Sequence, residues 1–577
     1  MGERISFGCT EQGMLVLEST AHSFTLSDSG KLRAAKTDGH ILVAESLKNL
    51  GVSHVYCVAG TPIRETFAMC ARLAIRPIGV RHQQAGVMMA LAQNYVAGRI
   101  TAVALFSAGP ALTNAATGIL VANDNGWPLV VLGGRRPLSM SGMGSFQDLD
   151  AVPIFQSITK WSALVENTAE IPHCLNRAFE IAMSGRPGPV YLDLPEDILT
   201  ATVHSGAIPS LSPKRELGID EGLLARAADI LLGAERPALI VGTDARWSDP
   251  FVELRRLVDE FGIPFTTAPM GRGYLPDDHP LCANFARAVL QGNADAVLLL
   301  GARLDWTFRF GAEISRDAKI IQIDVKESEI GVNRAPTIGI IGDIKLILQG
   351  LIARMTSRTT VAPRDRLSTW HARLDAARDS RKRDLEKQMN SAALPMLPHR
   401  MFKELRDFLP HDAICILDGN VTMAAGQQAL PCYLPVTRFT AGNNGCMGVG
   451  VPFAIGAKIA RPERMVVAVC GDMGFAMSGM DMETAVRHNI PIVVIVANND
   501  GNNGAVMEKI YFPQANERIT TFQPDIHYEA MMAAFGVHAE FVERPEQLRP
   551  ALERAIAAGK ASCINVRIDP YAPYPRD

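Results

Sequence analysis

The feature that most constrains this chain is a repeated alternation between short apolar runs, rich in Val, Ile and Leu, and helix-length amphipathic stretches. Buried parallel strands joined by crossover helices have this pattern. The runs form three series: 55–58, 78–80, 101–106, 129–132 and 190–194; then 238–241, 265–267, 296–300, 319–323 and 338–341; then 414–417, 465–469, 492–497 and 563–568. We therefore predict an α/β fold with three doubly wound parallel-sheet domains.

The segments between these series set the expected domain limits. A Pro-containing stretch at 208–213 separates the first two series, and a charged segment from about 353 to 390 separates the last two. We interpret the charged segment as a linker containing a solvated helix, because it has almost no strand signal. The expected division is an N-terminal extension at 1–38, domains at 39–205, 215–352 and 396–577, and a linker at 353–395.

Composition excludes several functional classes. The chain carries 57 Lys and Arg against 60 Asp and Glu, which gives no electrostatic footprint for nucleic acid or an anionic membrane surface. No apolar run reaches the ~18–20 residues of a membrane span, and residues 1–38 lack the features of a signal peptide. Ten scattered cysteines without a CxxC pair are typical of a reduced compartment. We expect a soluble, cytoplasmic protein that acts on small molecules, with an extension that is poorly ordered or docks a partner.

Two predicted strands of the third series end in oxygen donors followed by glycine. The first leads into Asp472, and the second leads into Asn499 and Gly501. Such strand ends meet in the crevice where doubly wound sheets bind ligands, and Mg²⁺ prefers oxygen ligands that include substrate phosphates. We predict that the Asp472 carboxylate, the Asn499 side-chain oxygen and the Gly501 carbonyl hold Mg²⁺. The backbone amides of the next helix would face phosphate oxygens; they belong to Met473, Gly474 and Phe475.

Taken singly, these Gly-Asp and Asn-Asn elements are ordinary turns. Together, with Asn499 lying 27 positions after Asp472, they resemble the diphosphate and metal motif of thiamine diphosphate enzymes. The glycine-rich segment 442–457 resembles the part of that family in which a methionine holds the cofactor in a bent V shape. The resemblance gives this role to Met447, whose alternative is ordinary core packing. It also implies that the Gly445 carbonyl takes the pyrimidine amino group and that Asn420, in Asp418-Gly419-Asn420, touches the diphosphate.

Within this superfamily the chain is most similar to the 2-hydroxyacyl-CoA lyase and oxalyl-CoA decarboxylase branch. The segments that carry this resemblance are 144–148, 185–195, 301–306 and 478–484. In such enzymes the middle domain holds an adenine nucleotide, either the CoA end of the substrate or ADP. Arg303 is then a candidate bidentate phosphate ligand, and a surface salt bridge with Asp305 or Asp324 is its alternative. The resemblance further implies a homodimer or homotetramer in which two subunits share each active site.

One departure from the family pattern concerns activation of the cofactor. The family places a glutamate against the pyrimidine N1′, and this contact makes the 4′ nitrogen the base that removes the thiazolium C2 proton. Here the corresponding element reads Arg81-His82-Gln83-Gln84, so Gln83 stands where a carboxylate is expected. Proton transfer of this kind contributes ~10²–10⁴-fold in rate. Three explanations remain open: a trapped or engineered Glu→Gln form, a natural member that activates its cofactor less directly, or a protein that binds the cofactor without turnover.

Two further departures lie near the expected substrate. The relatives usually place a tyrosine soon after the Asn-Asn-Gly turn, whereas this chain continues with Asn502, Asn503 and Gly504. Glu508 therefore becomes a candidate acid/base or orienting carboxylate, with an exposed helix glutamate as the alternative. Leu164 stands where nucleotide-binding relatives tend to carry arginine, so their nucleotide contacts do not transfer as a whole.

The resemblance implies an enzyme that makes or breaks the bond between C1 and C2 of a 2-hydroxyacyl-CoA, giving formyl-CoA and an aldehyde or ketone. The protein would position thiamine diphosphate, Mg²⁺ and the CoA ester, while the cofactor supplies the carbanion. One alternative is a 2-oxoacid enzyme similar to acetolactate synthase, or an oxalyl-CoA decarboxylase. Another is a catalytically silent scaffold, although a scaffold has no need of the metal ligands.

Overall fold

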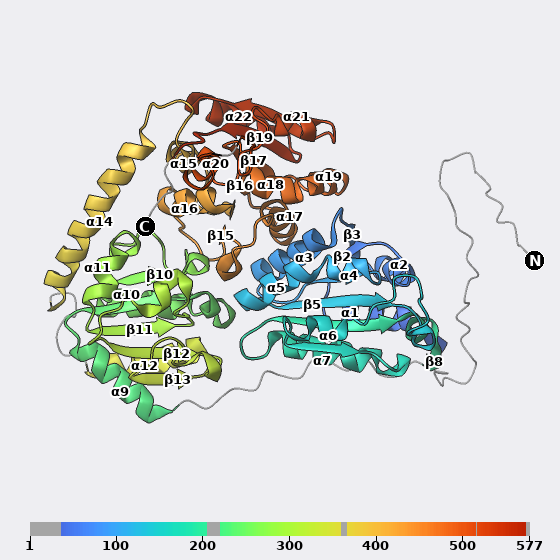
Figure 1. Ribbon diagram of the computed structural model, residues 1–577. Helices are drawn as coiled ribbons and strands as arrows, with labels where there is room; N and C mark the ends of the chain where they lie inside the picture. Colours follow the sequence, from blue (N-terminus) through green and yellow to red (C-terminus); the bar gives the residue numbers. More distant parts are fainter. Residues whose placement is uncertain (1–35, 205–219, 359–365, 515, 573–577) are drawn as a thin grey trace, which may run out of the picture.

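The computed structural model describes residues 36–204, 220–358, 366–514 and 516–572. These residues form three α/β domains, which Figure 1 shows with the first in blue to teal, the middle one in green and the third in orange to red. Each is built around a parallel sheet, with six, five and six strands in chain order. The predicted fold class is therefore confirmed. A separate antiparallel pair, β1 (Lys36–Asp38) and β8 (Thr202–His204), joins the beginning and end of the first domain.

The sheet of the first domain has the strand order β3-β2-β4-β5-β7-β6. Its strands are β2 (His54–Val58), β3 (Arg76–Gly79), β4 (Ala102–Phe106), β5 (Leu129–Arg135), β6 (Trp161–Leu164) and β7 (Pro189–Pro195). One face is covered by α1 (Gly39–Asn49), α2 (Arg64–Arg72), α7 (Ile171–Met183) and α8 (Glu196–Thr200). The other face packs against α3 (Gln83–Ala97), α5 (Ala116–Asn125) and α6 (Val152–Gln156), with the short α4 (Pro110–Thr113) at its edge.

The third domain repeats this topology. Its sheet has the order β15-β14-β16-β17-β19-β18, which is the same as in the first domain once strands are counted within each domain. The strands are β14 (Ile414–Asp418), β15 (Arg438–Phe439), β16 (Val466–Gly471), β17 (Val493–Asn498), β18 (His538–Val542) and β19 (Ser562–Arg567). One face packs against α15 (Pro398–Arg406), α16 (Asn420–Ala429) and α22 (Pro545–Ala557). The other packs against α17 (Gly450–Ala460), α18 (Asp472–Ser478), α19 (Met482–Arg487) and α21 (Tyr528–Ala533).

The middle domain has a smaller sheet with the order β10-β9-β11-β12-β13. Its strands are β9 (Pro237–Val241), β10 (Phe265–Thr267), β11 (Ala296–Leu300), β12 (Lys319–Asp324) and β13 (Ile338–Ile341). Helices α9 (Glu221–Gly233), α10 (Phe251–Phe261) and α12 (Ile344–Arg358) cover one face. The opposite face is completed by α11 (Arg287–Asn293) and by α14 (Ser368–Met389) from outside the sheet segments.

Helices α3 and α17 join the first and third domains into one core. They occupy equivalent places in the two topologies and lie against each other in Figure 1. A Cβ added to Gly456 of α17 would come within 2.2 Å of the Met89 carbonyl oxygen of α3. Glycine is therefore required at this crossing, and the close approach fixes the two domains relative to each other.

Helix α14 corrects the expectation of a solvated linker helix. Trp370 and Leu374 are buried in the core of the middle domain, and Leu385 and Met389 are buried in that of the third domain. The Trp370 indole also donates to the Pro237 carbonyl at 3.0 Å. The apolar positions form one narrow stripe among charged residues, so the sequence alone suggested solvation. The helix packs against both the middle and the third domain and runs along the left edge of Figure 1. The domain limits themselves remain predictions, although α12 continues beyond 352 to Arg358.

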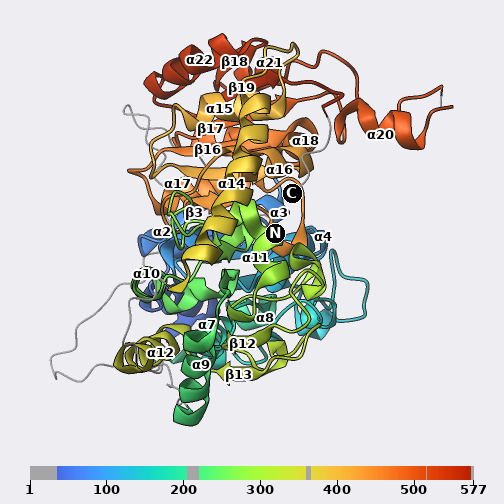
Figure 2. The same cartoon turned by 90° about the vertical axis from the view of Figure 1, so that its left-hand side faces the viewer.

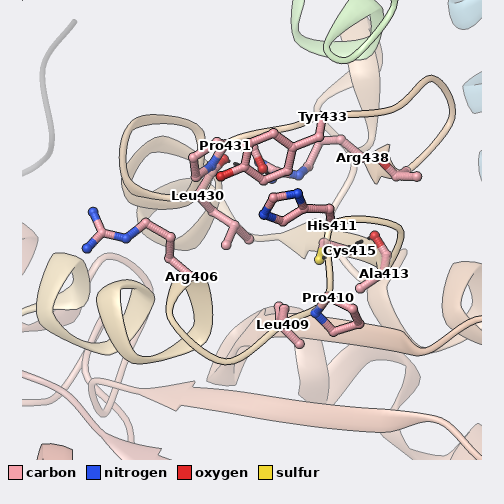
Figure 3. Close-up of a pocket in the computed structure, with 11 residues that line it drawn as sticks. Arg406, Leu409, Pro410, His411, Ala413, Cys415, Leu430, Pro431, Tyr433 and Arg438 are labelled. Atoms are coloured by element: carbon pink, nitrogen blue, oxygen red, sulfur yellow. Dashed lines mark hydrogen bonds between the residues drawn. The ribbon is translucent and has the colours of Figure 1, made fainter. Parts of the chain in front are cut away.

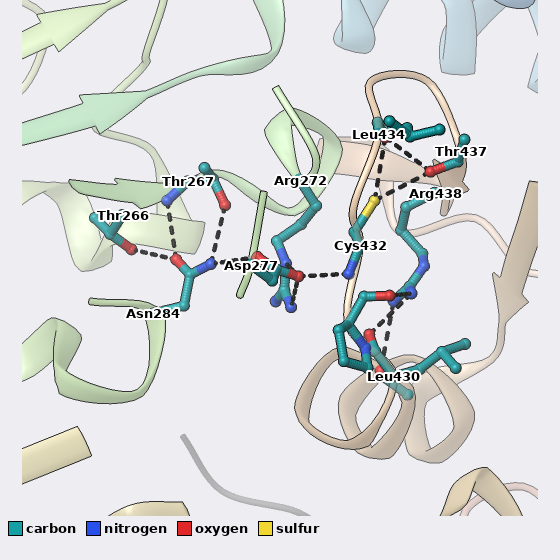
Figure 4. Close-up of polar contacts among 12 residues, drawn as sticks. Thr266, Thr267, Arg272, Asp277, Asn284, Leu430, Cys432, Leu434, Thr437 and Arg438 are labelled. Atoms are coloured by element: carbon teal, nitrogen blue, oxygen red, sulfur yellow. Dashed lines mark hydrogen bonds and ion pairs between the residues drawn. The ribbon is translucent and has the colours of Figure 1, made fainter. Parts of the chain in front are cut away.

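A buried polar cluster also ties the middle domain to the third. One oxygen of Asp277 accepts from Arg272 Nε at 2.9 Å and from the Cys432 backbone N–H at 2.7 Å, as Figure 4 shows. The other oxygen accepts from Asn284 at 2.9 Å. Because this carboxylate has partners from both domains, the loop before β15 is held against the middle domain.

The nine cysteines in the described part of the chain are all free. Within the same residues, the helices are too short or too polar to cross a membrane. The expectations for residues 1–35 lie outside the described residues, and the cytoplasmic location remains a prediction.

Candidate functional site

The main candidate site is a crevice at the carboxyl edge of the third sheet, where neighbouring strands β14, β16 and β17 end. The structure brings most of the predicted cofactor and metal residues together there: Asn420, Met447, Asp472, Met473, Gly474, Asn499 and Gly501 all line this crevice. Ligands bind at this edge in doubly wound folds. Phe475 contributes no side chain to the crevice, since it is buried against Tyr528. Gly445 is exposed just outside the lining residues.

Asp472 provides the negative charge of the crevice. Its side chain is only 1% exposed, and its two oxygens accept from the backbone N–H of Met473 at 2.8 Å and of Gly501 at 2.9 Å. Burial raises the pKa of this carboxyl to about 7, although these N–H donors act in the opposite direction. Within the described residues, no Lys, Arg or His forms an ion pair with it. A cation bound here would compensate this carboxylate for its lost hydration.

The Asn499 amide and the Gly501 carbonyl provide neutral oxygens beside this charge. The amide has two possible orientations. With its nitrogen toward Gly501, it donates to the Gly501 carbonyl at 2.9 Å and its oxygen accepts from the Gly504 N–H at 3.2 Å. In the reversed orientation two oxygens face each other across the same 2.9 Å. That is about the edge of a Mg²⁺ octahedron with bonds of ~2.0–2.1 Å. The donor set therefore fits Mg²⁺, provided that the amide turns its oxygen toward the ion.

Glu508 lies outside this crevice and holds a neighbouring segment. Its carboxylate accepts from the Thr520 hydroxyl at 2.7 Å and from the backbone N–H groups of Ile519 and Thr521, both at 3.0 Å. These bonds, with that from the Thr520 hydroxyl largest, lower the pKa of Glu508 to about 2. Thr521 in turn forms a bridge with Gly501. These contacts hold the segment around Thr520, and the expected role of Glu508 at the substrate, as acid/base or orienting carboxylate, remains a prediction. No sequence pattern pointed to these partners, which lie more than ten positions away.

Gln83 is the first residue of α3, at the carboxyl edge of the first sheet. His82 caps the helix by accepting the Gln84 N–H at 3.2 Å. The Gln83 side-chain oxygen accepts from the Asn114 amide at 3.1 Å. This bond leaves the Gln83 amide nitrogen as the group that is free to donate. Within one chain, Gln83 is not among the residues that line the crevice of the third domain.

A second crevice lies at the carboxyl edge of the middle sheet, where Gly242 and Gly301 end β9 and β11. A Cβ on Gly242 would overlap the Gly301 carbonyl, so glycine is required for this approach. Arg303 lines the crevice and donates to the Asp124 carbonyl of the first domain at 2.5 Å. In this structure it pairs with neither Asp305 nor Asp324, the partners of the salt-bridge alternative.

Two buried carboxylates to which the sequence analysis assigned no binding role lie beside this second crevice. Asp244 accepts from Arg186 Nε at 3.0 Å, and its other oxygen has no partner. Asp324 also has one oxygen without a partner, and burial together with the nearby Asp244 raises its pKa. Such acceptors suit the hydroxyl and amino groups of an adenosine. Asp324 directly follows the predicted strand 319–323. An acidic residue at the end of a predicted strand was the sequence signal that could have identified it.

A third hollow, at the opposite edge of the third sheet, is drawn in Figure 3. It lies below the amino end of β14, where the rings of His411 and Tyr433 stack with their centroids 3.9 Å apart. Amino edges of such sheets do not bind substrate as a rule. We assign no function to this hollow.

Three family models match the chain. They describe the N-terminal TPP binding domain, the central domain and the C-terminal TPP binding domain of thiamine pyrophosphate enzymes, at residues 37–154, 224–351 and 418–566. This chain belongs to the thiamine pyrophosphate enzyme family. Thiamine pyrophosphate, also called thiamine diphosphate, is therefore the implied cofactor. The matched C-terminal model includes Asp472 and the other proposed metal and cofactor residues of the crevice.

Curated relatives with three different names resemble this family member over nearly its whole length. A 2-hydroxyacyl-CoA lyase from Arabidopsis thaliana is 34% identical over 570 residues, covering 95% of this chain and 98% of the relative. An acetolactate synthase large subunit from Mycobacterium tuberculosis is 32% identical, covering 93% and 96%. Oxalyl-CoA decarboxylase from Escherichia coli K12 is 30% identical with the same coverage. These similarities define the branch and leave the substrate open.

Proposed function

We propose that this protein is a thiamine diphosphate- and Mg²⁺-dependent carbon–carbon lyase or ligase that acts on a 2-hydroxyacyl-CoA, giving formyl-CoA and an aldehyde or ketone. The observation that carries the proposal is the crevice of the third domain, where a buried carboxylate without a cationic partner lies beside two neutral oxygens. The similarity to a 2-hydroxyacyl-CoA lyase supports the substrate class.

Residues of the third domain would hold the cofactor at its diphosphate end. Asp472, Asn499 and Gly501 would bind Mg²⁺, and the amide of Gly474 at the start of α18 would face the diphosphate. The Met473 amide already donates to Asp472, so its contribution is to orient that carboxylate. Met447 and the Gly445 carbonyl would hold the pyrimidine. When bound, thiamine diphosphate supplies a stabilised carbanion for making and breaking carbon–carbon bonds.

Gln83 would act at the pyrimidine as a hydrogen-bond donor rather than as an acid. Its oxygen is engaged by Asn114, so its N–H is directed away from that bond. An amide donor can hold N1′, but it cannot transfer a proton to it at neutral pH. Of the three explanations for Gln83, we favour a natural enzyme that activates its cofactor less directly. We disfavour a silent scaffold, because a scaffold has no need of a buried carboxylate that a bound cation would stabilise in its charged form.

Completion of the site would require a second subunit, in a homodimer or homotetramer. Exposed apolar side chains near the two halves of the site support this: Met143 and Phe146 are 76% and 74% exposed in the first domain, and Tyr511 is 64% exposed in α20 (Gly504–Tyr511). Helix α20 projects from the body of the molecule in Figure 2. Apolar surfaces of this kind mark subunit contacts.

The middle-domain crevice would take the adenine nucleotide end of the CoA ester, or ADP. Buried acceptor oxygens of Asp244 and Asp324 would bind the adenosine, while Arg303 would meet a phosphate. The Asp124 carbonyl competes for this guanidinium in the present structure. Leu164, where relatives tend to carry arginine, removes one cationic contact from such a site.

A product assay tests the proposal. The protein, loaded with thiamine diphosphate and Mg²⁺, is incubated separately with a 2-hydroxyacyl-CoA, a 2-oxoacid and oxalyl-CoA. We expect formyl-CoA and an aldehyde or ketone from the first substrate only. CO₂ release from a 2-oxoacid or from oxalyl-CoA, without cleavage of the 2-hydroxyacyl-CoA, would support the acetolactate synthase-like or decarboxylase alternative instead. No product with any substrate, despite cofactor binding, would support the silent scaffold.

A further inference from the structure

Asp418 is a second buried carboxylate in the third domain, at the end of β14. Its side chain is 1% exposed. One oxygen accepts from the Gly450 backbone N–H at 2.8 Å and from the Gly448 N–H at 3.1 Å; the other is 3.2 Å from the same Gly448 nitrogen. The carboxylate thus holds both ends of the turn that joins Met447 to helix α17.

Glycines on three sides allow this close packing. A Cβ on Gly450 would come within 3.1 Å of Asp418 and 2.2 Å of the Cys470 sulfur. A Cβ on Gly474 would come within 3.0 Å of the Asp418 carboxylate. Gly448 has a φ of +84°, and a Cβ there would come within 2.8 Å of Met477 Cβ on α18. The turn after Met447 is therefore confined between Asp418 and α18, and side chains larger than hydrogen are excluded.

These contacts connect segments that are far apart in the sequence. Asp418 belongs to the first strand of the domain, the Met447 turn precedes α17, and Gly474 lies in the first turn of α18. Met447 and Gly474 therefore both lie beside one buried carboxylate, which bonds the turn after Met447 and packs against Gly474, although a complete helix and strand separate them in the sequence.

We propose that Asp418 is a positioning residue of the cofactor site, which holds the turn after Met447 through the amides of Gly448 and Gly450 and packs against Gly474 at the start of α18. This inference rests on the proposed function, because it assumes that Met447 and Gly474 face the cofactor. Asp418 itself is buried behind the turn and acts through these residues. Burial raises the pKa of Asp418 to about 6, while N–H bonds, first that from Gly450, act in the opposite direction. At neutral pH it is thus an ionised acceptor for these amides.

The test combines two measurements on the full-length protein. Asp418→Asn keeps the size of the side chain but replaces one acceptor oxygen with a donor nitrogen that opposes an amide N–H. Hydrogen–deuterium exchange of peptides covering 445–451 is measured without cofactor. Calorimetry then gives the affinity for thiamine diphosphate in Mg²⁺ buffer. We expect exchange and dissociation constant each to increase by at least ~10-fold, as for a charge-assisted bond replaced by a repulsive contact.

Two further variants keep the result interpretable. Glu529→Gln changes another buried carboxylate of the same domain, which bonds Asn565 away from the crevice. It should leave both measurements unchanged. Gly450→Ala keeps the Asp418 carboxylate but crowds it and the Cys470 sulfur, so the turn should shift and the loss of affinity should be reproduced. If Asp418→Asn proves poorly folded, as judged by rapid exchange in β19, the two measurements are made on Gly450→Ala instead.

The outcomes separate this inference from the proposed function. Faster exchange of the turn with unchanged cofactor affinity would overturn the positioning role, as would unchanged exchange. Wild-type protein that fails to bind thiamine diphosphate would contradict the proposed function and, with it, the cofactor role of Asp418. A structural role alone would lower the melting temperature while leaving the affinity of the folded variant unchanged.

Discussion

The first and third domains have the same strand order but very different carboxyl edges. In the third domain, the strand β16 leads directly into Asp472, and β14 ends in Asp418. In the first domain, the equivalent strand β4 leads into Ser107, and no Asp or Glu occurs between Glu65 and Asp124. We call the third-domain edge with these two buried carboxylates the charged edge, and the part of the first-domain edge around Ser107 and Gln83, in a stretch without Asp or Glu, the neutral edge. This difference shows that topology places a site at an edge, whereas single residues decide its chemistry.

For the proposed enzyme, the comparison separates binding from activation. The charged edge would hold Mg²⁺ and diphosphate, and the neutral edge would contact the pyrimidine through Gln83 and Asn114. If this division is correct, variants of the two edges should affect different measurements.

The largest effect is expected from Asp472→Ala. This change removes the only formal charge among the proposed metal ligands, so Mg²⁺-dependent binding of thiamine diphosphate should be abolished. Calorimetry in Mg²⁺ and in chelator measures it, with Glu529→Gln as the control for loss of a buried carboxylate. Unchanged affinity in Mg²⁺ buffer would show that Asp472 at the third-domain edge does not bind the metal.

Arg303→Ala changes a residue of the middle domain, which belongs to neither of the two edges compared above. If Arg303 meets a phosphate, the change should weaken binding of a CoA ester or ADP by ~1.5–3 kcal/mol and leave thiamine diphosphate affinity unchanged. KM values for the CoA substrate and calorimetry with ADP check this. Equal values in both proteins would show that Arg303 does not bind a nucleotide phosphate and only contacts the Asp124 carbonyl.

The pH dependence of stability tests the charge on Asp472 without any cofactor. Its pKa is raised to about 7 in the folded protein, so it stabilises the fold most when protonated. Stability should then fall as the pH rises from about 4 to 7, by ~1.4 kcal/mol per pH unit from this group. Asp472→Asn has no ionisable group at this position and loses no stability from it as the pH rises. Its melting temperature should therefore rise relative to that of wild type between about pH 4 and about pH 7. A constant difference would indicate an unperturbed carboxyl.

The smallest effect is expected at the neutral edge from Asn114→Ala. This change removes the hydrogen bond that holds the Gln83 side chain, which is worth ~0.5–1.5 kcal/mol. The rate of C2 proton exchange of the bound cofactor should therefore change only a few-fold. Cofactor affinity should remain as in wild type. Thr113→Ala, which removes a neighbouring hydroxyl that bonds Pro110, is the matched control. A large loss of affinity would mean that Asn114 binds the cofactor directly.

The central strands could be predicted from the sequence because they are continuous apolar runs. Strands β6, β15 and β18 of the parallel sheets were missed, and all three lie at sheet edges; the separate short pair β1 and β8 was also missed. Strands β6 and β18 are mostly half-buried and lack such runs, whereas the edge strands β3, β10 and β13 contain apolar residues and were predicted. Strand β15 is also only two residues long.

The candidate site was predictable where it follows strand ends, as for Asp472, Asn499 and Gly501. The roles of Asp418, Asn114 and Thr520 were not predictable, because each depends on a contact with a segment that only the fold brings near. The charged sequence of α14 likewise hid Trp370 and Met389, whose burial depends on two separate domains.

One measurement tests the division between the two edges most directly. Deuterium exchange at C2 of bound thiamine diphosphate, followed by NMR after acid quench, is compared in wild type and Gln83→Glu at saturating Mg²⁺. The account predicts equal cofactor affinity in both proteins and exchange that is faster by ~10²-fold in the variant, because a carboxylate at N1′ restores proton transfer. Exchange that is no faster in Gln83→Glu would contradict the placement of Gln83 at the activating position.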